Sequence, residues 1–177
     1  MPISISEIII GSFRGIWSWV VFMAAGVVVG VWFFPDLYSR LIPVVENIFG
    51  NFVMGSDGQL LAPSVLIRLI FLKNLQTAVL CFLTARITFG ILPGLILFFN
   101  GVLIGVLAVF LHQDGLSYSS FVLHLLPHGI FELPALFLAC AIGMYGVRLN
   151  GWKALLLPLF MLAIAAAVEV LISPKII

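Results

Sequence analysis

The stretch IWSWVVFMAAGVVVGVWFF, residues 16–34, decides the fold class because it is a long apolar run without a single charged side chain. A helix needs about 20 apolar residues to cross a hydrocarbon core roughly 30 Å thick. Pro35 and Asp36 end the run. No basic region with a following cleavage site precedes it, so it predicts a retained transmembrane helix rather than a signal peptide.

The composition of the whole chain agrees with this interpretation. Of its 177 residues, 63% are hydrophobic and 8% are charged, and the mean hydropathy is +1.29. Soluble domains carry roughly 25% charged residues, so most of this surface must face the lipid bilayer. A net charge of +1 leaves no broad basic surface, which excludes nucleic acid as a partner. The chain is therefore expected to be a protein of the cell membrane.

Four further apolar runs have the length of a membrane span. They are residues 66–85, 91–111, 127–147 and 154–173. The expected fold is all-α: a polytopic transmembrane helical bundle of about five spans, forming one integral membrane domain over residues 1–177.

Residues 37–53 have a different pattern, in which apolar side chains recur at helical spacing between charged and amide side chains. This pattern predicts an amphipathic helix lying in the membrane interface. Gly55-Ser56-Asp57-Gly58 follows as a loop, and residues 113–120 form a second polar loop.

The basic residues predict an orientation. With five spans, one side of the membrane receives Arg14, Arg86, Arg148 and Lys153, and the other receives Arg40, Arg68 and Lys175. Because cytoplasmic loops carry an excess of Lys and Arg, the N-terminus is expected in the cytoplasm and the C-terminus outside.

Small residues recur four apart at Gly26/Gly30 and Gly101/Gly105, a spacing that lets helices approach closely. We interpret both pairs as packing within the bundle rather than as a seam between copies of the chain. Both cysteines lie inside apolar runs and are interpreted as small buried hydrophobes.

Ionisable groups inside a membrane are costly, and this chain has few. In the five-span arrangement, Lys73, Glu132 and Glu169 lie about 10, 8 and 6 Å deep in the same leaflet. We expect Lys73 to pair with one of the two carboxylates. Such a pair either fixes helix packing or belongs to a functional polar site that opens outward.

His128 and Glu132 are four residues apart in LPHGIFELP and share a helix face. Three roles stay open: a hydrogen bond that packs helices, general acid–base chemistry, or a metal site completed by His124 and Glu169. The spacing matches no metal-binding motif, so we predict neither a metal nor a cofactor. Gly129 is expected to leave room for a close neighbour.

LPHGIFE, together with FLKNLQTA (71–78) and FFNGVLIG (98–105), resembles the stage II sporulation protein M family, also called DUF95. The resemblance covers roughly residues 65–150. The family residues that it carries over are Asn74, Asn100, His128, Gly129 and Glu132. The family often has paired Asn where this chain has Lys73-Asn74, so Lys73 is a candidate on its depth alone.

This resemblance implies a membrane scaffold that positions other membrane or envelope proteins, such as cell-envelope enzymes, because the family's namesake acts with peptidoglycan-degrading partners. Self-association is a further option. A transporter or channel component with a polar intramembrane path is the alternative. An intramembrane hydrolase using His128 and Glu132 is the third hypothesis. Of these hypotheses, we favour those in which the protein has no enzymatic activity.

Overall fold

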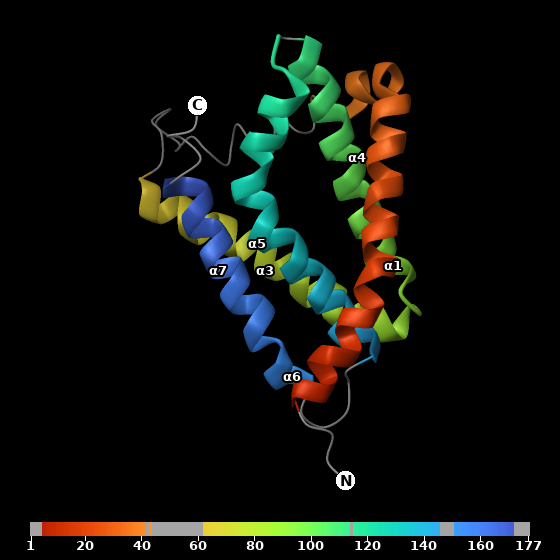
Figure 1. The fold of residues 1–177 in the computed structure, drawn as a ribbon, viewed down its shortest axis with the longest axis vertical. Coiled ribbons are helices and arrows are strands. Elements are labelled where there is room, and N and C mark those ends of the chain that lie inside the picture. The colour runs from red at the N-terminus through yellow and green to blue at the C-terminus, as the bar shows by residue number, and fades with distance from the viewer. Residues whose placement is uncertain (1–4, 42, 44–61, 114, 146–150, 172–177) are drawn as a thin grey trace.

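The computed structural model describes residues 5–41, 43, 62–113, 115–145 and 151–171, and within them the regular structure is helical. The helices are α1 (Ile5–Trp32), α3 (Pro63–Ile87), α4 (Ile91–Gln113), α5 (Tyr118–Tyr145), the short α6 (Gly151–Ala154) and α7 (Leu156–Leu171) (Figure 1). The all-α prediction is confirmed. After a break at Phe33, residues 34–41 are again helical, but most of the expected interfacial helix at 37–53 lies outside the described residues.

Three of these helices are long and apolar enough to cross a bilayer: α1 through its segment Gly15–Trp32, α3 and α4. The apolar segments Gly129–Met144 and Leu156–Leu171 are shorter. Together with the broadly apolar exposed surface, these helices make the chain a helical membrane bundle.

Helix α5 begins at Tyr118, whereas the sequence suggested a start at Pro127. Its first turn is stabilised by Ser117, whose Oγ accepts a hydrogen bond of 3.1 Å from the backbone N–H of Ser120. This is the geometry of a serine N-cap. Part of the expected polar loop at 113–120 is therefore the start of a helix, and Pro127 is an internal residue of it.

Helices α1 and α4 run in the same direction and pack at backbone contact. A Cβ added to Gly26 would meet the backbone of Phe98 and Val102, and one added to Gly101 would meet the backbone of Met23 and Val27. One turn further along, Gly30 and Gly105 face each other in the same way. We call these four glycines the glycine seam. The seam confirms that both pairs pack within the bundle.

Helices α3 and α5 also run parallel to each other, opposite in direction to α1 and α4 (Figure 1). A Cβ on Gly143 of α5 would meet the Phe82 backbone of α3. Helix α7 runs back along α5, so α1 begins and α7 ends at opposite ends of the bundle.

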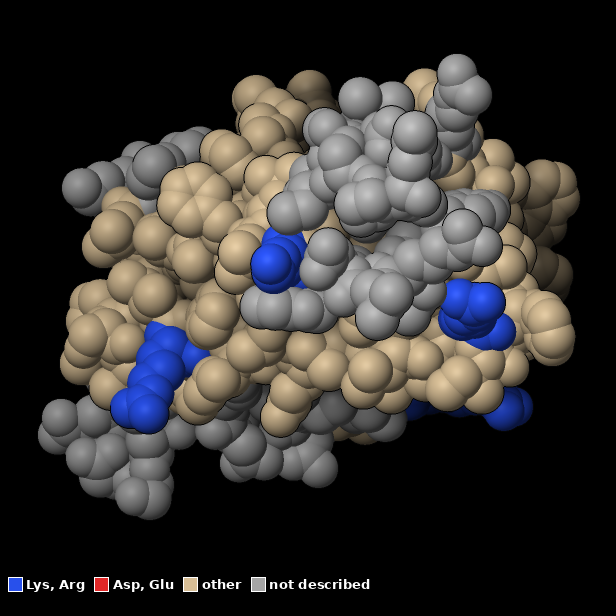
Figure 2. All heavy atoms as spheres, turned by 90° about the horizontal axis from the view of Figure 1, so that it is seen from below, with Lys and Arg blue, Asp and Glu red and all other residues tan. Residues whose placement is uncertain are grey.

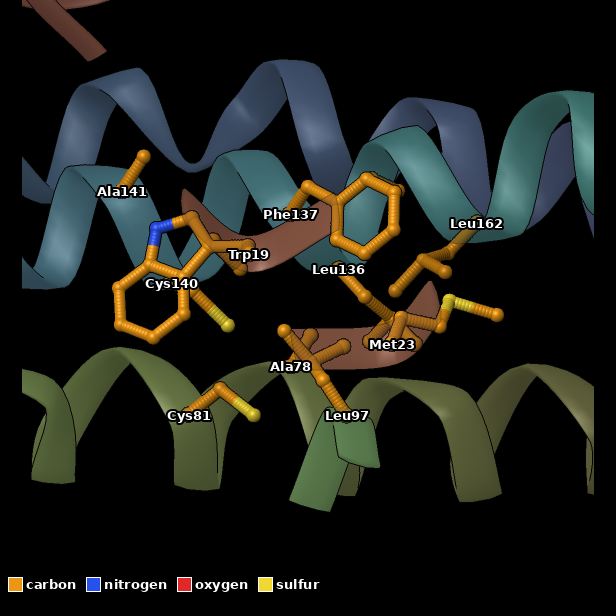
Figure 3. Packing of buried hydrophobic residues seen from close by; sticks show 12 residues of the cluster. Trp19, Met23, Ala78, Cys81, Leu97, Leu136, Phe137, Cys140, Ala141 and Leu162 are labelled. Carbon is orange, nitrogen blue, oxygen red and sulfur yellow. The ribbon is translucent and has the colours of Figure 1, made fainter. Parts of the chain in front are cut away.

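Five of the helices meet in the largest of three clusters of buried side chains in the described part of the chain. Figure 3 shows this core, with side chains from α1, α3, α4, α5 and α7: Trp19, Met23, Ala78, Cys81, Leu97, Leu136, Cys140 and Leu162. Fully burying one such apolar side chain contributes about 1.5–3 kcal/mol relative to water. In lipid, close packing and not water exclusion supplies the stabilisation, which suits the many small residues found here.

Candidate functional site

Glu132 lies where α5 enters the bundle. Upstream of it, Leu126 and Ile130 are exposed, and downstream every residue from 135 to 143 is buried. Glu132 itself is only 9% exposed, and its Oε2 atom is shielded from solvent. It is the one buried charged side chain among the residues that the structure describes. The family motif thus places a carboxyl group at the edge of the core.

Asn74 lies on α3, which packs against α5. It lies on the inward face of α3 with Ala78, Cys81 and Ala85, and its Nδ2 is buried with no hydrogen-bond partner in the described part of the chain. Cys81 of α3 lies beside Cys140 of α5, and the two helices run parallel. Asn74 lies two turns before Cys81 on α3, and Glu132 lies about two turns before Cys140 on α5. By this counting along parallel helices, Asn74 and Glu132 are at a similar level.

Glu169 belongs to the same level. It is half-buried on α7, two turns beyond Leu162 of the core. Helix α7 runs antiparallel to α5, so two turns forward from Leu162 on α7 is equivalent to about two turns back from Leu136 on α5. This counting places Glu169 near the level of Gly129. That these polar groups share one half of the membrane stays a prediction.

Lys73 occupies a different place from its neighbour Asn74. Its side chain is exposed, on the other side of α3 from the inward face. Consecutive residues on a helix are about 100° apart, so Lys73 and Asn74 cannot both point into the core. A pairing between Lys73 and a carboxylate stays a prediction.

Asn100 and Gly129 contribute less than expected. The Asn100 side chain is half-buried and donates a hydrogen bond of 3.0 Å to the Ile96 carbonyl of its own helix. A Cβ at Gly129 would meet only Leu133 Cδ1, at an ordinary 3.6 Å, so no close neighbour among the described residues requires glycine there. His128 lies within α5, and its side chain is outside the described part.

The cysteines form a pair that the sequence did not reveal. Both are fully buried, as expected of small hydrophobes, and their thiols lie within hydrogen-bond distance of each other between α3 and α5 (Figure 3). Spacing in sequence carries no signal for this contact, because it depends on the parallel register of two helices.

Among the described side chains, no group of three His, Cys, Asp or Glu gathers, while the side chains of His124 and His128 lie outside this part of the chain. A zinc site in a protein uses three or four such ligands.

A bundle of long apolar helices with a largely apolar exposed surface and a buried carboxyl group at the edge of its core is an integral membrane protein. The chain belongs to the family described as Stage II sporulation protein M, whose family model matches residues 19–174. This match covers nearly the whole chain and confirms the resemblance seen in the motifs. No curated protein and no solved structure matches the chain.

Proposed function

We propose that this chain is a multi-pass scaffold of the cell membrane, which holds partner proteins such as cell-envelope enzymes in place. Its membership of the Stage II sporulation protein M family makes a membrane role the starting point. The scaffold role is our extension of that membership.

The observation that carries the proposal is the close packing of the bundle's core. The buried residues of the described part are apolar or small, apart from Glu132. Helices α1 and α4 touch through backbone at the glycine seam, and α3 and α5 touch at Gly143. Such packing gives a rigid body, because no side chain lies between the helices that could move aside. Rigid support suits a scaffold better than it suits a transporter, which has to open a path.

For this scaffold we propose an orientation in which the N-terminus lies in the cytoplasm. Figure 2 views the bundle from its lower end, where α1 begins and where α3 passes into α4. The described part of this face carries blue Lys and Arg side chains and no red acidic ones. Arg86 and Lys153 are both exposed. A basic end is typical of the cytoplasmic side, which leaves the opposite end for envelope partners.

A transporter or channel component is the second candidate, and the burial of Glu132 favours it. A buried carboxyl group at Glu132 and a buried amide at Asn74, on two helices that pack against each other, are the kind of polar groups that ion and proton pathways use. The hydrolase reading depends on His128 and has no comparable observation behind it.

Co-purification separates these candidates. The tagged full chain is extracted with its surrounding lipid in a polymer nanodisc, and the proteins retained with it are identified by mass spectrometry. The matched control is the Glu132→Gln variant. A scaffold retains the same envelope proteins in both forms. A chain that retains none, but loses a proton or ion flux in vesicles on Glu132→Gln, would refute the scaffold and support the transporter.

A further inference from the structure

Helix α3 has two polar faces, one inward and one outward. The inward face carries Asn74 among small buried residues. The outward face carries Gln76 in its middle, with the cations Arg68 and Lys73 on its two edges, and all three side chains are exposed. The rest of that face is apolar and exposed: Val65, Leu72, Val79, Leu80, Leu83 and Ile87.

The position of Gln76 along the helix makes its exposure notable. α3 extends from Pro63 to Ile87, so Gln76 lies within one residue of its midpoint. Arg68 is about 12 Å nearer to one end, where a long side chain can reach the headgroup region. A glutamine has no such reach, and its amide would lie in hydrocarbon about 15 Å from either surface.

An outward amide at mid-span indicates a contact with another membrane helix. Polar side chains in transmembrane helices often hydrogen-bond across helix pairs, because the hydrocarbon itself offers them neither donor nor acceptor. Gln76 supplies two donors and one carbonyl acceptor, and a carboxyl group can bond to it in either protonation state.

The charges on α3 select the partner. The helix contains three cations, Arg68, Lys73 and Arg86, and no acidic residue. A symmetric contact between two copies of this face would bring like charges together in a medium that screens them poorly. A partner helix with a carboxyl group near its middle avoids this repulsion and is attracted by the cationic edges.

We propose that the outward face of α3, centred on Gln76 and edged by Arg68 and Lys73, docks a transmembrane helix of a partner protein that carries an acidic side chain near mid-membrane. This inference rests on the proposed scaffold role and names the chemical class of the partner. Its exposed apolar residues supply the packing surface, and Gln76 supplies the specific hydrogen bond.

The test uses the full chain in phosphatidylcholine vesicles and a synthetic helix of about 20 leucines flanked by lysines. One form of the peptide has Glu at its centre and the other has Leu, and energy transfer between labelled peptide and labelled chain measures association. The Glu peptide should bind more tightly. Gln76→Leu should weaken its binding by about 3- to 30-fold, equivalent to about 0.6–2 kcal/mol. The matched control is Ser18→Leu, the same loss of an exposed polar group on α1, which should leave binding unchanged.

Any of the following results would overturn the inference: equal binding of both peptides, equal effects of Gln76→Leu and Ser18→Leu, or photo-adducts of a reactive group at Leu80 to a second copy of the chain. Adducts to added phosphatidylglycerol in place of the peptide would overturn it as well. Failure here differs from failure of the scaffold role. A native complex that survives Gln76→Leu keeps the scaffold and rejects this face, whereas the absence of any native complex rejects the scaffold.

Discussion

The glycine seam predicts that Gly101→Ala, the smallest possible change, destabilises the bundle. The new Cβ would lie 3.0 Å from the Val27 amide nitrogen and 3.1 Å from the Met23 carbonyl carbon, and closer still to the Met23 carbonyl oxygen. Ordinary carbon contacts are about 3.5–4.0 Å. All three atoms belong to the backbone, so no rotamer change relieves the overlap, and α1 and α4 must separate by roughly 1 Å.

The cost of this separation can be estimated from the contacts it weakens. A gap of 0.5–1 Å forfeits about a quarter to a half of each dispersion contact along the interface. Overpacking of this kind costs about 1–3 kcal/mol. At about 2–4 °C for each kcal/mol, a loss of about 2 kcal/mol lowers the Tm by roughly 4–8 °C. The double variant Gly26→Ala/Gly101→Ala should cost less than the sum of the single changes, because one separation accommodates both methyl groups.

The chain supplies its own reporter for this measurement. Cys81 and Cys140 are its only cysteines and are fully buried, so a maleimide dye that fluoresces on thiol reaction follows unfolding in detergent. Gly129→Ala is the matched control, because its Cβ would meet only Leu133, at an ordinary distance. This control should be neutral or slightly stabilising, since Ala favours a helix over Gly by up to about 1 kcal/mol. If the Tm of Gly101→Ala equals that of the Gly129→Ala control, the close approach of α1 and α4 is wrong.

Three further predictions follow from the helix arrangement. Iodine, which takes two electrons and two protons from a pair of thiols, should join Cys81 to Cys140 and abolish maleimide labelling after denaturation in SDS; two labelled thiols per chain would contradict their contact. Reporters fused before α1 and after α7 should signal from opposite sides of the membrane, whereas matching signals would require an even number of crossings. If Glu132 neutralises Lys73, Glu132→Gln should lower the free energy of unfolding and Lys73→Met should partly restore it; an unchanged stability without rescue would reject that pairing.

The sequence predicted the helices well, because long apolar runs have few alternatives in a membrane. It favoured Pro127 as the start of α5 and left an earlier start within residues 121–126 open, whereas the helix begins at Tyr118; Pro127 is also tolerated inside a membrane helix, and the capping role of Ser117 is a weak local signal. It also identified the glycine spacing, although not that the two pairs face each other.

The orientation of side chains around each helix was beyond sequence reasoning. In a soluble helix, polar residues mark the outer face, but α3 is apolar on both faces and carries polar residues on both. Depth along the helix could therefore be worked out for Lys73 and Asn74, while the face that each occupies could not. The contact of Cys81 with Cys140 depends on the same missing information.

The parallel pairing of α1 with α4 has a consequence for how the protein is made. Two parallel spans cannot be neighbours in sequence, so α1 enters the bilayer long before the helix that covers Gly26 and Gly30 has been synthesised. During that interval its glycine surface faces lipid or the insertion machinery. A chain whose synthesis stops before α4 therefore displays an unfilled backbone groove, a feature by which membrane quality control can distinguish an unfinished product from a finished one.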